Sequence, residues 1–465
     1  MRDDTTFLAV WKQLSLDIVR WPHRPPVRPF GRVALDRAQA PYAGGRRPGP
    51  QAVRVAAQHD EKQDHVDRFA AVERELRKAA PHLLLDVVTA ALREQYGVKS
   101  VELRLADYGM TTLQVVSEAP LAEPVHIHDS PQGRAFGAQE PYVEPRATQG
   151  PVTAHLPVSV RGDRLGVLSV TAPESSCSPA GLAEMQQLCE ALGHEILVAE
   201  RDTDLYLLAR RATRLTLAAE MQWQLLPGRS VARPEFSLGA HLEPAYAIFG
   251  DNFDWSVSAH HLTLTVTNGM GKGMEAALLT NLVVNALRNA RRAGLDLPGQ
   301  ASLADQAVYA QHRGALHASV LLLRFDLATG EVEAVDAGSP RMWRLRGGDV
   351  AAVDFDAQLP LGMFEETEYV AEHFRVEPGD RLLIGSDGVY DSASAAGERY
   401  GERALARSLS AHRFLPSGQV PLAVLRDLRD YRGPAPLDDD ALVACLDWFG
   451  RQSSTGDAST GDASA

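Results

Sequence analysis

Apolar and polar residues follow two kinds of spacing along the first half of the chain. Residues 64–94 place apolar side chains near every third or fourth position, which predicts helix. Shorter segments then alternate between apolar and polar residues, as strands do. These segments are 101–105, 113–116 and 155–160. Residues 161–170 are typical of a hairpin with a Gly-Asp turn before a strand, and 179–200 return to helical spacing. The pattern predicts an α+β unit over residues 65–200.

A second helical pattern connects this unit to the rest of the chain. Between residues 202 and 224, apolar side chains recur at steps of three and four, which predicts one long helix. Pro227 ends it, because proline cannot continue a helix. We assign residues 201–232 to a helical linker. Two interpretations remain open: a spacer that packs on one domain, or a signalling helix that couples two domains through a dimer interface.

The C-terminal half alternates strands with short polar turns. Residues 262–267 form an alternating strand that runs into the glycine-rich turn 268–273. A helix is predicted from Met274 to Ala293, closed by Gly294. The turn could mark a nucleotide site, but its glycines do not fit G-x-G-x-x-G. Lys272 is followed by glycine, so the Walker A pattern fails as well.

Composition sets limits on function and location. The chain has 465 residues and 45% hydrophobic residues, enough for two or three domains. Its net charge of −13 argues against a nucleic-acid binder. The three cysteines have no disulfide spacing, and no apolar run has the length of a membrane span. We therefore expect a cytoplasmic protein that contacts neither membrane nor nucleic acid.

Both ends of the chain differ from the rest. Residues 1–64 are predicted to be a disordered arm, basic and rich in proline, with seven prolines between Pro22 and Pro50. Residues 451–465 repeat small and polar residues and are predicted to be a flexible tail.

Four polar turns in the C-terminal half lie at strand ends. Asp251 and Asp254 follow Gly250, and Asn268 ends the alternating strand. Asp387 follows the apolar strand 381–385, while Asp439 precedes a further apolar strand. Oxygen ligands gathered from separate strand ends are how proteins bind Mg²⁺ or Mn²⁺. A single Asp-Gly turn is more often structural, but four such turns together predict a site for a hard cation.

The ordered motifs of this half resemble the SpoIIE-like branch of the metal-dependent PPM protein phosphatases. The motifs are Gln222–Pro227, Phe249–Asp251, Asn268–Gly273, Ala337–Pro340, Pro360–Gly362, Ser386–Gly388 and Asp439–Asp440. The resemblance covers residues 233–450. It implies a PPM-type α/β/β/α sandwich of two antiparallel sheets.

The resemblance also implies a chemistry. Members of the family hold two Mn²⁺ or Mg²⁺ ions that lower the pKa of a water molecule and direct it at a phosphoserine or phosphothreonine. By motif position, the metal ligands here would be Asp251, Asn268, the Gly269 carbonyl, Asp387 and Asp439. The implied substrates are phosphorylated anti-sigma factor antagonists, in partner-switching regulation.

The chain departs from the family pattern at three positions. Asn268 replaces the metal-bridging aspartate, so one charge that offsets the repulsion between two cations is absent. Lys272 adds a cation nearby, which would oppose metal binding or hold a substrate phosphate. Phe249 replaces a glycine. We therefore consider two, one or no metal ions.

Three functions stay open on the sequence alone. The first is a serine/threonine phosphoprotein phosphatase under the control of the N-terminal unit. The second is a degenerate phosphatase that binds a phosphoprotein or antagonist without efficient hydrolysis. The third is a ligand sensor whose C-terminal unit serves only assembly. Asn268 separates the first two.

The N-terminal unit resembles a GAF domain, most closely the kind that precedes SpoIIE-like domains in actinobacteria. Leu105–Leu113 and Gly133–Phe136 carry the likeness. The resemblance implies a sensor domain over 65–200 with a small ligand, and a homodimer.

Overall fold

The computed structural model describes most of the chain between residues 69 and 451. The described ranges are 69–117, 123–145, 150–212, 214–244, 249–434 and 437–451. The arm predicted for residues 1–64 lies outside these ranges, as does all but the first residue of the tail predicted for 451–465.

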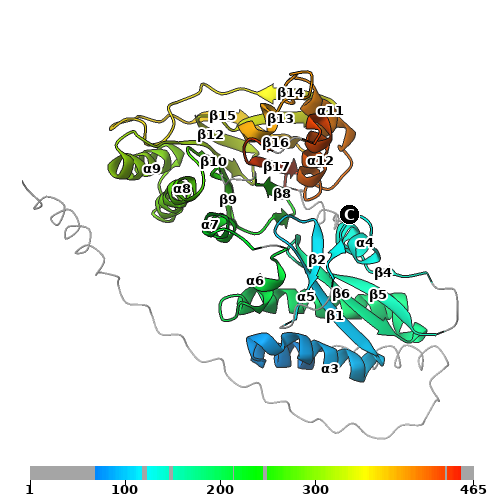
Figure 1. Cartoon of the computed structure of the whole chain (residues 1–465). Coiled ribbons are helices and arrows are strands. Elements are labelled where there is room, and N and C mark those ends of the chain that lie inside the picture. The colour runs from blue at the N-terminus through cyan, green and yellow to red at the C-terminus, as the bar shows by residue number, and fades with distance from the viewer. Residues whose placement is uncertain are drawn as a thin grey trace, which may run out of the picture. The chain divides into compact units, whose positions relative to one another are not determined.

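The N-terminal half contains one antiparallel sheet of six strands, in the order β3-β2-β1-β6-β5-β4 (Figure 1). Its strands are β1 (Ser100–Ala106), β2 (Thr112–Val115), β3 (Val125–His126), β4 (Tyr142–Val143), β5 (Val152–Val160) and β6 (Asp163–Ala172). Its helices are residues 69–78, η1 (Pro81–Leu83), α3 (Leu84–Tyr96), α4 (Pro131–Ala138), η2 (Glu174–Cys177) and α5 (Pro179–Ala199). Helix and sheet together give the expected α+β class, while the GAF likeness stays a prediction.

Helices cover both faces of this sheet. Leu168 of β6 lies in a core with side chains of α3 and α5, such as Leu92 and Leu192. Val167, one position earlier, lies in a second core with Phe136 of α4. Adjacent residues of a strand point to opposite faces, so both faces are buried. The first helical pattern is interrupted near Pro81, which begins a short 3-10 turn.

The hairpin between β5 and β6 has a different turn from the one expected. Arg161 (φ +52°) and Gly162 (φ +92°) are the two central residues, and Asp163 already belongs to β6. Positive φ at both central positions is the geometry that matches the strand twist of a tight hairpin. The turn is therefore Arg-Gly rather than Gly-Asp.

Gly166 of β6 provides a stability test for this sheet. A Cβ atom at Gly166 would lie 2.0 Å from the Arg104 carbonyl oxygen of β1. We expect Gly166→Ala to lower the free energy of unfolding by about 2 kcal/mol, because backbone atoms have to separate. Gly137 of α4 has nothing within 4 Å of such a Cβ. Gly137→Ala should therefore be neutral or slightly stabilising in the same urea titration, and equal losses from both would contradict this account.

The single helix expected over residues 202–224 is wrong. The chain forms two short helices, α6 (Leu205–Ala209) and α7 (Leu217–Leu225). The side chain of Thr216 accepts a hydrogen bond from the backbone N–H of Ala219 at 3.2 Å and so caps a new helix. Apolar spacing continues across the break, which explains why periodicity alone missed it.

The C-terminal half is a sandwich of two antiparallel sheets (Figure 1). One sheet has the order β15-β12-β11-β10-β9 and the other β14-β13-β16-β17-β8-β7. The strands of the first are β9 (Asp251–Val257), β10 (His261–Gly269), β11 (Ala318–Asp326), β12 (Glu331–Ala337) and β15 (Glu372–Arg375). Those of the second are β7 (Ser230–Arg233), β8 (Phe236–Glu243), β13 (Arg341–Arg346), β14 (Asp349–Val353), β16 (Arg381–Gly385) and β17 (Ala441–Trp448).

Helices cover the outer face of each sheet. The helices are α8 (Met274–Arg292), α9 (Leu297–His312), α10 (Asp387–Tyr390), α11 (Ala404–Ala411) and α12 (Val420–Arg432). Leu322 of β11 packs with Val283 of α8, whereas its neighbour Leu323 faces the core between the sheets. Cys445 of β17 likewise packs under α11 and α12. The observed fold is the expected α/β/β/α sandwich.

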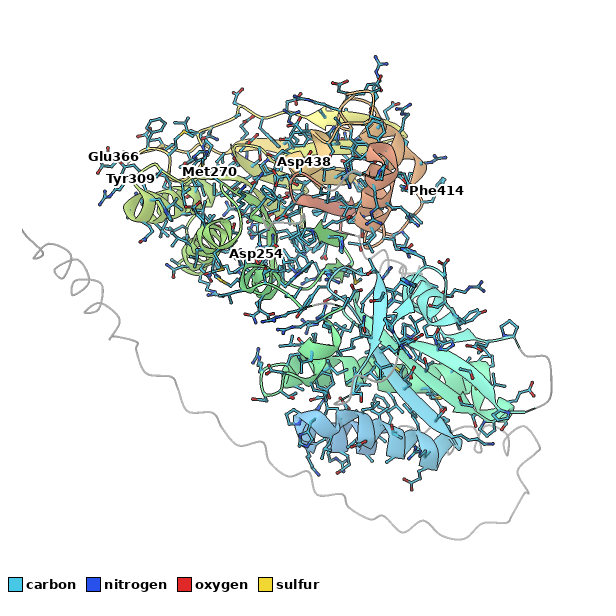
Figure 2. The ribbon with its side chains drawn as sticks, viewed as in Figure 1. Asp254, Met270, Tyr309, Glu366, Phe414 and Asp438 are labelled. Carbon is cyan, nitrogen blue, oxygen red and sulfur yellow. The ribbon has the colours of Figure 1, made fainter. Side chains whose placement is uncertain are left out.

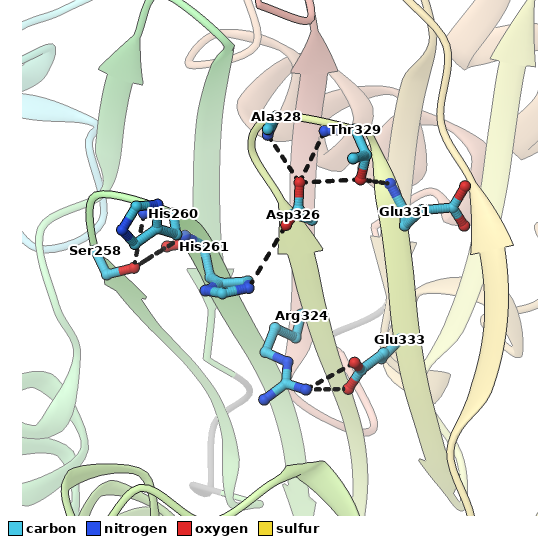
Figure 3. Close-up of polar contacts among 9 residues, drawn as sticks. All are labelled: Ser258, His260, His261, Arg324, Asp326, Ala328, Thr329, Glu331 and Glu333. Atoms are coloured by element: carbon cyan, nitrogen blue, oxygen red, sulfur yellow. Dashed lines mark hydrogen bonds and ion pairs between the residues drawn. The ribbon is translucent and has the colours of Figure 1, made fainter.

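One end of the five-stranded sheet is fixed by local polar contacts (Figure 3). Asp326 closes the turn after β11 by accepting hydrogen bonds from the backbone N–H groups of Ala328 and Thr329, at 2.9 and 2.8 Å. These bonds, the Thr329 backbone first, lower the pKa of Asp326. Asp326 pairs with His261 at the start of β10. Asn268, which is paired with Asp251, lies at the other end of β10.

Among the residues that the structure describes, no helix combines the length and the apolar character needed to cross a bilayer.

Candidate metal centre

Four of the sequence-predicted residues lie at ends of strands in the sandwich. Asp251 begins β9, and Asn268 is directly opposite it near the end of β10. Asp387 follows β16, and Asp439 stands just before β17. The first pair belongs to one sheet and the second to the other.

The Asn268 side chain connects the two sheets. Its Nδ2 donates hydrogen bonds to Asp387 Oδ1 at 2.6 Å and to Ser339 Oγ at 3.3 Å. A carboxylate at position 268 could make neither bond, because it has no hydrogen to donate. The amide therefore satisfies Asp387 in this arrangement without a cation.

Gly250 allows the start of β9 to approach the end of β10. Its φ is +99°, and a Cβ there would lie 2.7 Å from the Gly269 carbonyl oxygen. The Gly269 N–H also donates to the Gly250 carbonyl at 3.2 Å. Glycine is the residue that adopts this conformation without strain. The predicted carbonyl ligand at Gly269 thus lies beside the turn that positions Asp251.

Asp440, the second aspartate of the Asp-Asp motif, holds this turn in place. Its Oδ2 accepts hydrogen bonds from the backbone N–H groups of Phe249 and Gly250 at 2.9 and 3.2 Å. It also accepts one from Nε2 of Gln222 in α7, at 3.0 Å. Gln222 Nε2 lies 2.9 Å from the Asp251 carbonyl as well. These contacts give the Gln222 position of the motif a structural role.

The carboxylate of Asp251 is fully buried, and its two oxygens have no hydrogen-bond partner among the described residues. The hydroxyl of nearby Ser386 instead donates to the Asp440 carbonyl oxygen at 3.4 Å, and it accepts a hydrogen bond from the Leu442 N–H at 3.0 Å. Burial raises the pKa of Asp251 well above its usual value, and the charges of Asp440, Asp387 and Asp439 raise it further. A buried carboxylate of this kind stays ionised only beside a compensating positive charge.

The two aspartates from the other sheet share this condition. Burial, and then the charge of Asp387, raise the pKa of Asp439 to about 7. Burial also raises the pKa of Asp387. Neighbouring carboxylates repel each other when ionised, and a divalent cation among them would remove that repulsion. In charge and in oxygen donors, the residues fit Mg²⁺ or Mn²⁺.

The side chains of these residues are not arranged as they would be around a bound metal ion. Among the described residues, no group of three or more Asp, Glu, His or Cys side chains is placed to hold one metal. Asn268 presents its nitrogen, a donor, to Asp387. For a cation to bind at Asp387, the amide has to turn its oxygen inward or move aside.

An open cleft borders Asp387 and Asp439. It has a volume of about 630 Å³, and its charged lining residues are Asp387, Asp391, Asp438, Asp439 and Arg432. Four carboxylates against one guanidinium make the cleft acidic. A phosphate group would therefore be repelled from it unless a cation were bound.

Lys272 is exposed on the turn before α8 and is not among the residues that line this cleft. Its role in substrate binding remains a prediction.

Two features of the site differ from the sequence argument. Asp254 does not join Asp251, because residues three apart in a strand point to opposite faces. Asp254 instead forms ion pairs with Arg288 and Arg291 of α8, at 2.8 and 3.1 Å, and Figure 2 shows it apart from Asp438. The sequence argument assigned Asp440 no role, although its position directly after Asp439 in the Asp-Asp motif was the available signal.

Comparisons with known proteins find similarities to the C-terminal half. Residues 258–449 match the family model described as stage II sporulation protein E (SpoIIE). Protein IcfG of Synechocystis is 20% identical over 48% of this chain and 40% of its own length. The phosphoserine phosphatase RsbU of Bacillus subtilis is 20% identical over 40% of this chain and 56% of its own length. The chain thus spans about half the length of these relatives.

A solved structure of the RsbU and RsbW domains of Rv1364c from Mycobacterium tuberculosis is similar at 21% identity. It aligns with a TM-score of 0.43, over 50% of this chain and 64% of that one. The family model and the two-sheet sandwich agree on the C-terminal half. Residues 258–449 are therefore similar to the SpoIIE family.

Proposed function

We propose that this protein is a metal-dependent serine/threonine phosphoprotein phosphatase of the SpoIIE type. The observation that carries the proposal is the buried carboxylate of Asp251, which has no partner among the described residues and is close enough to Asp387 and Asp439 for their charges to raise its pKa. Asp251 belongs to one sheet of the sandwich, and Asp387 and Asp439 adjoin strands of the other. The motifs that supply them are far apart in the sequence.

In the proposed reaction, the residues of the chain position a phosphorylated side chain beside the acidic centre. Bound Mn²⁺ or Mg²⁺ would supply Lewis acidity and an activated water. Asp251, Asp387, Asp439 and the Gly269 carbonyl would hold the metal, and Asn268 would offer its amide oxygen. The cleft next to Asp387, with a volume of about 630 Å³, has room for a phosphoserine side chain. Once a bound cation offsets the carboxylates, Arg432 on its wall would attract the phosphate.

The substrate class comes from the family resemblance rather than from the site. We propose a small phosphorylated regulatory protein of the anti-sigma factor antagonist type, dephosphorylated in the cytoplasm under the control of the GAF-like domain at 65–200. The phosphatase domain would occupy 233–450. The proposal also includes a small ligand that binds the GAF-like domain, and a homodimer of the chain.

Removing Asp387 tests the proposed function. We expect Mn²⁺-dependent hydrolysis of a phosphoserine peptide by the wild type, and a loss of at least about 10²-fold in Asp387→Asn, since one anionic metal ligand is gone. Asp430→Asn, an exposed change on α12, is the matched control and should keep full activity.

Phosphate release measured with Mn²⁺, with Mg²⁺ and after metal removal distinguishes the outcomes. Release that is unaffected by Asp387→Asn would refute the assigned site. A wild type that binds the phosphorylated protein in a pull-down but releases no phosphate under any condition would instead support the non-hydrolysing alternative.

A further inference from the structure

A second polar cavity lies away from the acidic centre, between the N-terminal sheet and the segment that follows α7. Its volume is about 420 Å³. The lining residues that matter here are Tyr108, Asp163, Glu200, Arg210, Trp223 and Arg229.

Two arginines of this cavity retain unused hydrogen-bond donors. Arg229 is 8% exposed, and its Nη1 has no partner among the described residues. Nε of Arg210 is also buried and without a partner there. The remaining contacts fix the Arg229 side chain, whose Nη2 donates to the Tyr108 carbonyl. Buried donors are nearly always paired, so two guanidinium nitrogens without a partner among the described residues at one cavity call for an acceptor.

The charges around the two arginines are incompletely balanced. Burial, and next the charge of Arg210, lower the pKa of Arg229 to about 10. Asp163 accepts a hydrogen bond from the Arg229 backbone N–H at 3.1 Å, and Glu200 lies 3.7 Å from Arg210 Nη1. Burial raises the pKa of both carboxyl groups, and the charge of Arg210 acts against that rise. Arg201 adds a third guanidinium to the lining. The cavity therefore favours an anion.

Aromatic rings hold the guanidinium groups in position. Tyr108 and Trp223 stack with their ring centroids 5.2 Å apart. The Arg210 guanidinium lies 5.1 Å from the Tyr108 ring, and that of Arg229 lies 5.5 Å from the Trp223 ring. Each ring therefore contacts the other ring and one guanidinium group, and the rings are unsuited to stack on a further flat ligand. The group they leave room for is small and polar.

We propose that this cavity is a binding site for a small oxyanion, a phosphate or carboxylate group carried by a small molecule, which accepts hydrogen bonds from Arg210 and Arg229. Planar guanidinium groups match the geometry of both groups. The site is independent of the proposed phosphatase activity, since it contains none of the aspartates of the acidic centre.

Calorimetric titration of the full chain tests this site. The protein is first stripped of metal by dialysis, so that phosphate does not bind through a cation at the acidic centre. Inorganic phosphate and succinate are titrated separately against chloride at matched ionic strength. We expect at least one to bind, and the better of the two identifies the source of the oxyanion. Arg210→Gln should weaken that binding at least about tenfold, whereas Arg210→Lys, which keeps the charge, should weaken it less.

Two control variants separate this site from the acidic centre. Asp387→Asn and the exposed Arg292→Gln should bind as the wild type does. Absence of binding by both probes would overturn the proposal, as would binding that Arg210→Gln leaves unchanged. If Arg210→Gln fails to fold, hydrogen exchange of the wild type decides. Saturating probe should protect residues 223–229, and no change there would equally overturn the proposal.

Discussion

Asn268→Asp is expected to raise Mn²⁺-dependent hydrolysis of p-nitrophenyl phosphate about 10²-fold over the wild type. A carboxylate at this position supplies the missing charge between two divalent cations, and contributions of this kind amount to several kcal/mol. The amide also donates to Asp387 Oδ1 at 2.6 Å, and the substitution frees that oxygen for a metal.

The same substitution should affect stability in opposite directions with and without metal. Without metal, a new carboxylate would stand close to Asp387, whose pKa burial has already raised, so the variant should melt at a lower temperature than the wild type. With Mn²⁺, the variant should gain more in melting temperature than the wild type, because ligands that bind the folded state stabilise it.

A matched control and a double variant complete this test. Asn289→Asp places the same change on the exposed side of α8 and should alter neither hydrolysis nor the response to Mn²⁺. Lys272→Ala combined with Asn268→Asp removes the nearby cation and should not reduce activity below that of Asn268→Asp. A fully active wild type that gains nothing from Asn268→Asp would show that the amide serves as well as a carboxylate.

Motifs at strand ends were the part of the fold that the sequence could predict. Val266 and Leu264 of β10 alternate with threonines, and the glycines that follow mark where the strand must end. Such local patterns located β10, α8, β16 and β17, which together position Asn268, Asp387 and Asp439. The family resemblance supplied the sandwich of two antiparallel sheets, which local patterns do not contain.

Side-chain partners that are distant in sequence could not be predicted. Asp251 and Asp254 look equivalent in the sequence, and only the sheet shows that Asp254 faces Arg288 and Arg291. Helix α7 begins at a single capping residue, Thr216. In the sequence, this one capping signal is weak beside the apolar spacing that continues across the break. A donor such as Arg229 Nη1, which has no partner among the described residues, becomes visible only when its neighbours in the fold are known.

Asp440→Ala is expected to destabilise the protein by about 3 kcal/mol, the largest stability effect anticipated for a single residue of the acidic centre. One oxygen of Asp440 accepts from Phe249 N, Gly250 N and Gln222 Nε2. Truncation leaves these donors without their acceptor, and each buried donor left unpaired costs about 1 kcal/mol or more.

Removal of the Asp440 charge acts in the other direction, because that charge helps to raise the pKa of Asp251. Asp440→Asn separates the two effects. Its carbonyl oxygen can still accept from the same donors, while the repulsion with Asp251 disappears. Urea denaturation should therefore show a loss well below that of Asp440→Ala. Asp438→Ala, at an exposed position of the same acidic run, should change stability little. Equal losses in Asp440→Asn and Asp440→Ala would show that the charge of Asp440, rather than its hydrogen bonds, holds the turn before β9.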